Sequence, residues 1–266
     1  MNILDKIIAD KKIEVKEQKT LISIDQLKNQ IKPLPKCRNF YKAVTKPNKR
    51  GLNVIAELKK ASPSAGIIRE DFNPVDIAKI YKNCNADAIS ILTDEKYFQG
   101  KIQYIKQVRD VVDMPILRKD FIIDPWQIYQ SRAAGADAVL LIAETLNTSQ
   151  LSDLMILASE LTLTVLLEIH SMESLLSVRS MIGFPKKGYS ILGINNRNLE
   201  TMKVDLNNTI RLAEFVDNKR ELVAESGIKT KEHVEKLISV GLGAVLIGQT
   251  LCEHTDIEQK FNELFS

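Results

Sequence analysis

The chain has few cysteines, and none of them lies in a paired motif. Cys37, Cys84 and Cys252 are far apart, their number is odd, and no C-x-x-C occurs. The three histidines are scattered too. This pattern argues against a disulfide framework and a zinc site, and it favours a reducing compartment.

Segments typical of membrane and nucleic-acid proteins are also missing. The start, residues 1–6, does not resemble a signal peptide, and no apolar run reaches membrane-spanning length. The formal net charge is only +3, without a basic block that interleaves aromatic residues. We therefore expect a cytoplasmic protein that binds neither nucleic acid nor membrane.

What the chain has is a regular alternation of two patterns. With 266 residues, of which 44% are hydrophobic, it suits one large domain or two small ones. Short apolar runs predict eight strands, at residues 54–58, 88–92, 115–117, 138–142, 164–168, 190–194, 222–224 and 244–247. Amphipathic stretches predict helices at residues 74–83, 102–112, 125–134, 149–160, 172–181, 207–216, 231–240 and 257–264.

This alternation indicates a parallel sheet whose outer face is covered by helices. Asn73-Pro74 and Asp124-Pro125 each combine an N-cap with a proline in the first helical position. An open doubly wound sheet is the alternative, but it usually carries a Gly-rich dinucleotide fingerprint, which is missing here. We therefore predict an α/β fold, a (β/α)₈ TIM barrel over residues 51–266.

The first fifty residues differ from the rest. Apolar residues at helical spacing, beginning with Ile3, Leu4 and Ile7, run through a charged segment, and residues 24–31 offer a second helix. A barrel needs no extra helix to close, so this apolar stripe must be buried elsewhere. We predict an N-terminal helical extension, residues 1–50, that covers the catalytic mouth within one domain overall. A plug at the other end of the barrel is the alternative.

Polar residues gather where the predicted strands end, which is where barrel enzymes carry their chemistry. Glu57 and Lys59 lie two residues apart on one strand, so they point the same way. A surface ion pair would explain any one such site, but a ring of charges beside apolar runs indicates groups that pair with each other or with a ligand. The ring comprises Glu57, Lys59, Thr93, Asp94, Arg118, Lys119, Asp120, Glu168, Asn195, Asn196, Arg197, Glu225 and Ser226.

The loops after the last two strands indicate a phosphate site. They are Ser226-Gly227 and Gly248-Gln249, and glycine lets backbone N–H groups approach an anion closely. Barrel enzymes often bind phosphate at these two loops, and Lys59 would add positive charge. We expect a phosphorylated small molecule as the partner.

Taken together, six motifs resemble the indole-3-glycerol-phosphate synthase family. They cover residues 56–64, 92–98, 117–121, 167–170, 193–199 and 224–228, and the likeness extends over the whole chain. Other phosphosugar barrels, such as phosphoribosylanthranilate isomerase or the tryptophan synthase alpha subunit, do not need this set of charges. A barrel that has become a binding or scaffold protein is a further alternative, which the intact ring disfavours.

The resemblance implies a carboxy-lyase of tryptophan biosynthesis that needs no metal and no organic cofactor. It closes the ring of 1-(2-carboxyphenylamino)-1-deoxyribulose 5-phosphate, with loss of carbon dioxide and water, to give indole-3-glycerol phosphate. Lys119 would be the general acid of ring closure. Glu168, Glu57 and Lys59 are the candidates for dehydration, and their roles stay undivided. Asn195 and Glu225 would orient the sugar and the lysines.

The resemblance also implies the binding residues. The substrate would contact Ser62, Pro63, Phe98, Phe121, Arg197 and Leu199, and the phosphate would contact Lys59, Ser226, Gly227, Gly248 and Gln249. Two positions depart from the family pattern. Gln249 replaces a common serine, which keeps the backbone donor but loses a hydroxyl, and Asn198 replaces an aspartate that could orient Arg197. We expect a monomer or a weak homo-oligomer.

Overall fold

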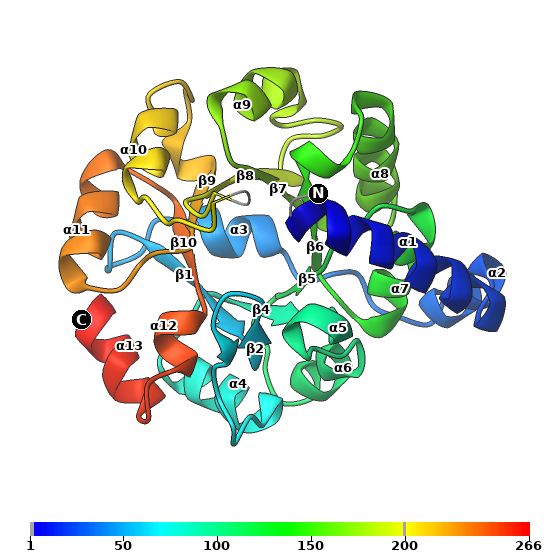
Figure 1. Ribbon diagram of the computed structural model, residues 1–266, viewed down its shortest axis with the longest axis horizontal. Coiled ribbons are helices and arrows are strands. Elements are labelled where there is room, and N and C mark those ends of the chain that lie inside the picture. Colours follow the sequence, from blue (N-terminus) through cyan, green and yellow to red (C-terminus); the bar gives the residue numbers. More distant parts are fainter. Residues whose placement is uncertain (1–2, 199–200) are drawn as a thin grey trace.

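The strands of the protein form a closed parallel barrel. The computed structural model describes residues 3–198 and 201–266. Its strands pair in the order β1-β10-β9-β8-β7-β6-β5-β4 and back to β1, which confirms the predicted TIM barrel (Figure 1). The strands are β1 (Asn53–Leu58), β4 (Ala88–Leu92), β5 (Ile116–Lys119), β6 (Ala138–Ile142), β7 (Thr164–Ile169), β8 (Ser190–Asn195), β9 (Leu222–Glu225) and β10 (Ala244–Ile247).

Helices surround the barrel as the amphipathic pattern predicted. They are α4 (Pro74–Asn83), α6 (Gln103–Arg109), α7 (Pro125–Ala134), α8 (Thr148–Glu160), α9 (Met172–Val178), α10 (Asn207–Ala213), α11 (Lys231–Val240) and α13 (Ile257–Phe265). Asn73 and Asp124 accept hydrogen bonds from the first turns of α4 and α7, as their N-cap positions predicted. Within the described ranges, no helix is long and apolar enough to cross a membrane.

Several short elements were not predicted, because segments of fewer than two helical turns show too little periodicity in the sequence. The predicted helices at 102–112 and 207–216 are also too long, since α6 and α10 end three residues earlier. The short elements are α3 (Phe40–Thr45), α5 (Glu95–Phe98), α12 (Gln249–Cys252), the hairpin β2 (Ala61–Ser62) and β3 (Gly66–Ile67), and the 3₁₀ turns η1 (Ala143–Thr145), η2 (Arg179–Met181) and η3 (Lys219–Glu221).

Helix α3 closes one end of the barrel. Phe40 and Val44 are buried against the inward-facing side chains of the strands, among them Ile55 and Leu117. At the start of β1, the Asn53 side chain donates to the Val44 carbonyl oxygen at 2.9 Å. The plug that we considered for the N-terminal extension is therefore present, and α3 forms it.

The rest of the extension reaches the opposite end of the barrel. Helix α1 (Ile3–Leu21) runs from the centre of the ring outward, and α2 (Ile24–Ile31) follows it at the rim (Figure 1). Val15 and Leu27 pack on Trp126 of α7, whose Nε1 donates to the Ile22 carbonyl at 2.8 Å. Ile3, Leu4 and Ile7 line a cavity at the carboxyl ends of the strands. The extension thus covers the mouth with α1 and plugs the base with α3.

A buried lysine ties α1 to the strand ends. The side chain of Lys11 is 1% exposed, and its Nζ lies 2.8 Å from Asp94 Oδ2 and 3.0 Å from Asp120 Oδ1. Asp120 also pairs with Arg118 at 2.9 Å. Although burial opposes the charge, the two aspartates raise the pKa of Lys11. The ammonium is therefore charged at any working pH, and it holds the cover over the mouth.

We predict that Lys11→Met destabilises the protein strongly, because Asp94 and Asp120 would stay buried without their shared cation. Removing one partner of a buried ion pair typically costs about 3–5 kcal/mol. The free energy of unfolding from urea titration measures the change. Lys12→Met, at the exposed neighbouring position, is the control and should change stability little. An equal loss in both variants would contradict the prediction.

Candidate active site

Lys119 stands between two glutamates at the carboxyl ends of the strands. It ends β5, and its Nζ lies 3.2 Å from Glu168 Oε2 on β7 and 3.5 Å from Glu225 Oε2 on β9. The Glu168 and Glu225 side chains are only 3% and 1% exposed. Asn195, which ends β8 between them, donates to Glu168 Oε1 at 3.2 Å. The Lys119 ammonium therefore forms ion pairs with two buried carboxylates.

The second pair lies on β1, on the same inward face that the two-residue spacing predicted. Lys59 Nζ is 3.5 Å from Glu57 Oε1, and Ser90 donates to Glu57 Oε2 at 3.3 Å. Gly248 leaves the space that Glu57 occupies, since a Cβ there would lie 2.5 Å from Glu57 Oε1. A glycine at that position is therefore needed to seat Glu57.

The two glutamates beside Lys119 have opposite pKa shifts. Burial, followed by the negative charge of Glu168, raises the pKa of Glu225 well above its usual range. Burial also acts on Glu168, but Lys119 and His170 outweigh it and lower the pKa of Glu168 well below its usual range. Although burial opposes its charge, Lys119 keeps a raised pKa because Glu168, Glu225 and Glu57 surround it. The two shifts favour the ionised form at Glu168 and the protonated form at Glu225, beside the Lys119 cation.

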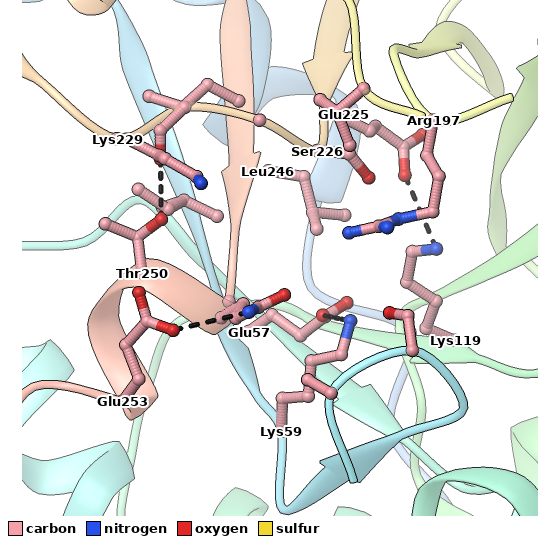
Figure 2. Close-up of a pocket in the computed structure, with 18 of the residues that line it drawn as sticks. Glu57, Lys59, Lys119, Arg197, Glu225, Ser226, Lys229, Leu246, Thr250 and Glu253 are labelled. Carbon is pink, nitrogen blue, oxygen red and sulfur yellow. Dashed lines mark hydrogen bonds and ion pairs between the residues drawn. The ribbon is translucent and has the colours of Figure 1, made fainter. Parts of the chain in front are cut away.

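A polar cavity of about 410 Å³ opens beside these groups. Lys59, Lys119, Arg197 and Lys229 all point toward this space (Figure 2). Both predicted phosphate loops border it, and their residues Ser226, Gly227, Gly248 and Gln249 line it together with Ser64, Val204 and Thr250. At Gly227, where φ is +81°, a Cβ would lie 2.3 Å from Val204 Cγ1, so the loop requires glycine.

An apolar compartment of about 110 Å³ adjoins the polar cavity beneath α1. The two share Glu57, Lys59, Ser64, Lys119, Arg197, Met202 and Ser226 as lining residues. The Phe98 and Phe121 rings lie 6.1 Å apart in it, and Lys59 Nζ lies 5.5 Å from the Phe98 centroid. Further lining comes from Ile3, Leu4, Ile7, Ser62, Pro63, Leu92, Leu140 and Ile142.

Arg197 lies at the junction of the two compartments. Its backbone N–H donates to Asn195 Oδ1 at 3.0 Å, and its Nη1 donates to the Met202 carbonyl at 3.1 Å. The Asn198 side chain accepts from the Thr201 backbone N–H at 2.8 Å, so the residue in place of the usual aspartate helps to form the turn. Leu199, predicted to contact substrate, lies outside the described residues.

Part of the predicted ring of charges has a structural role. Thr93, Asp94 and Arg118 do not line either compartment; they belong to the network that holds Lys11 and Asp120. Asn196 accepts from Thr209 Oγ1 at 2.8 Å and likewise organises a loop. Arg118 pairs with Asp120, which also meets Lys11 and lines the apolar compartment. The functional interpretation of the whole ring was therefore too broad.

Two charged groups near the site were missed from the sequence. Lys229 lines the polar cavity, but it lies in a loop that has no periodicity. His170 contacts Glu168, and its position two residues beyond Glu168, directly after β7, could have indicated this by alternation. Among the described residues, no group of three or more His, Cys, Asp and Glu side chains could hold a metal ion.

Acid–base groups around an open cavity at the carboxyl ends of a (β/α)₈ barrel define the protein as an enzyme of the TIM-barrel class. Solved structures support the fold: 3-hexulose-6-phosphate synthase superposes with a TM-score of 0.63 at 14% identity, over 80% of this chain and 98% of that one. A mutant tryptophan synthase alpha subunit from Pyrococcus furiosus gives a TM-score of 0.59 at 14% identity, over 80% and 97%.

Sequence comparison narrows the class to a family. The family model for indole-3-glycerol phosphate synthase matches residues 4–264. The enzyme of that name from Clostridium acetobutylicum is 47% identical over 98% of this chain and 96% of its own length. The one from Acetivibrio thermocellus is 44% identical over 98% of both chains. The chain belongs to the indole-3-glycerol phosphate synthase family, which confirms the resemblance and makes the protein a carboxy-lyase of tryptophan biosynthesis.

We predict that Glu225→Gln stabilises the fold at alkaline pH but not at acidic pH. A carboxyl whose folded pKa is raised favours folding fully below its unfolded pKa, about 4.3, and loses that contribution as pH rises through the folded pKa. Glutamine stays neutral throughout, so its advantage should grow by about 1.4 kcal/mol for each unit of elevation.

Urea unfolding at pH 5 and pH 9 measures this difference. Glu168→Gln is the matched control and should destabilise the protein at pH 9, because the pKa of Glu168 is lowered by cations that would lose their partner. A Glu225→Gln variant that is less stable than the parent at pH 9 would refute the pKa ordering.

Proposed function

We propose that the two adjoining compartments bind 1-(2-carboxyphenylamino)-1-deoxyribulose 5-phosphate and that Lys119 closes its ring. The observation that supports this most is the position of Lys119, which lines both the apolar and the polar compartment. An ammonium at their junction would meet the carbonyl of a substrate whose aryl end lies in one compartment and whose phosphate lies in the other.

The linings favour this orientation. Phe98, Phe121 and Pro63 offer an apolar surface to the aryl ring, and Ser62 lies beside them. Arg197, at the junction, would pair with the aryl carboxylate. The phosphate would lie between the Ser226-Gly227 and Gly248-Gln249 loops, where backbone N–H groups and Lys59 provide positive potential.

The chemistry needs three proton transfers. As the aryl carbon attacks the ketose carbonyl, Lys119 donates a proton to the developing alkoxide, and carbon dioxide leaves from the attacking ring carbon. The new hydroxyl then leaves as water after protonation, and a base removes a proton from the adjacent CH₂. The lowered pKa of Glu168 keeps it in the ionised form that this base requires, with Lys59, oriented by Glu57, as the acid. Asn195 and Glu225 would orient Glu168 and Lys119.

We infer further that the extension, residues 1–50, and the barrel, residues 51–266, form one domain, because Lys11 is buried among barrel side chains. The protein would act in the cytoplasm, consistent with three unpaired cysteines. The phosphorylated substrate is the proposed partner, and the protein would be a monomer or a weak homo-oligomer.

We predict that Lys119→Met retains the fold and loses ring closure. Proton transfer by a positioned side chain commonly accelerates a reaction about 10²–10⁴-fold, and stabilisation of the developing oxyanion would add to this acceleration. Turnover of the carboxyphenylamino substrate, followed by indole fluorescence, measures the loss. Lys101→Met, at an exposed position outside both compartments, is the control. Near-normal turnover by the Lys119 variant would remove this residue from the mechanism.

We predict that Gly248→Ala raises KM and lowers kcat together. The added methyl group would block approach of the phosphate and would displace Glu57, whose Oε1 it would meet at 2.5 Å. Gln249→Ser is the matched control at the next position and should be mild, because the backbone donor remains. A phosphate ion bound at the α3 end of the barrel, with none between the two loops, would count against this site.

A further inference from the structure

His170 connects the active site to a glutamate outside it. The residue follows β7 directly, and its side chain is 10% exposed. On one side, Nε2 lies 3.2 Å from Glu168 Oε1; on the other side, Nδ1 lies 3.1 Å from Glu144 Oε2. His170 lines neither compartment, so it acts through Glu168 and does not touch the substrate.

The positions of both ring nitrogens determine the charge of His170. Both nitrogens lie within ion-pair distance of a carboxylate oxygen, although neither makes a hydrogen bond of regular geometry. A carboxylate donates no hydrogen bond, so protonation of both nitrogens suits these two contacts. A neutral ring would place one lone pair against a negative charge. His170 is therefore an imidazolium, and although burial alone would lower it, the pKa of His170 is raised to about 10 by Glu144 and Glu168.

Glu144 is itself fixed in place. It lies in the η1 turn after β6, and its Oε1 accepts from the His170 backbone N–H at 2.9 Å and from the Ser174 hydroxyl. Glu144 thus holds both the backbone and the ring of His170. The imidazole presents Nε2 to Glu168 as a consequence of this contact.

The two oxygens of the Glu168 carboxylate face different partners. Its Oε1 meets His170 and Asn195, while its Oε2 faces Lys119. Glu225 from β9 faces it as well, and Glu57 from β1 adds a further negative charge to the cluster. In the described part of the chain, the ion pairs of Glu225 reach Lys119 alone, so Glu168 has one cation more than Glu225.

We propose that His170, held by Glu144, is a positioning residue that keeps Glu168 ionised and directs the shared proton to Glu225. This proposal rests on the proposed function, in which Glu168 is the base of dehydration. Because His170 contacts Glu168 and not Glu225, Glu168 stays ionised as the base while its neighbour Glu225 takes the proton. His170 also fixes the orientation of the Glu168 carboxylate, because one oxygen is tied back and the other stays beside Lys119.

The variant His170→Gln removes the charge and keeps a hydrogen-bond donor near Glu168. The pKa of Glu168 should rise, so the acidic limb of the kcat–pH profile should move upward by about one pH unit, with KM nearly unchanged. His254→Gln is the matched control at a position that lines neither compartment, and its profile should follow that of the parent. A His170→Gln profile that superimposes on the parent profile would overturn the proposal.

A second measurement needs neither substrate nor turnover. With ¹⁵N-labelled histidine, NMR of the unmodified protein at pH 8 should show both ring nitrogens of His170 protonated. Glu144→Gln should bring the loss of one of these protons below pH 8, since one of the two carboxylates is then neutral. A single protonated nitrogen in the parent protein at pH 8 would refute the imidazolium. If the parent protein failed to turn over the substrate while the NMR result held, the proposed function would fall and the charge arrangement would stand.

Discussion

The geometry of the catalytic mouth depends on keeping one ammonium, Lys119, inside a ring of carboxylates. Taking these charges out of water is expensive, and the cost is offset only when each charge is held at close range by its partners. The barrel provides this, because strands β1, β5, β7 and β9 all end at one mouth and bring Glu57, Lys119, Glu168 and Glu225 together. Three acids face Lys119, and Lys59 pairs with one of them, Glu57; the raised pKa of Glu225 and the contact of His170 with Glu168 relieve the remaining negative charge.

The end of β5 contributes to two networks of charged side chains, one in the active site and one that anchors α1. Side chains alternate across β5, so Lys119 points into the mouth while Arg118 points the other way and pairs with Asp120, the residue that follows the strand. Asp120 meets Lys11 of α1. The position of the cover and the position of the proposed general acid are therefore set by consecutive residues, Lys119 and Asp120, and a shift in one would be felt by the other.

Periodicity sufficed for the barrel strands and the longer helices, and N-cap residues fixed where α4 and α7 begin. The six-residue plug α3 could not be predicted this way, because Phe40 and Val44 are recognised only by what they fill. Strand alternation also placed Glu57 and Lys59 on one face. The partner of His170 could not be foreseen, because Glu144 comes from a turn after another strand and only the closed barrel brings the two together. Asp94 and Arg118 resembled site residues in the sequence because only the closed barrel shows their partners. Asp94 pairs with Lys11, and Arg118 pairs with Asp120, the other partner of Lys11.

Phe40 and Val44 seal the base, and both compartments described above lie at the other end of the barrel, which serves as the doorway. Substrate, carbon dioxide, water and the finished product all have to use that doorway, in turn, past the first turns of α1. A bulky product therefore leaves by the path along which the next substrate arrives, and the small gas molecule formed midway has to escape past the phosphate-bearing intermediate.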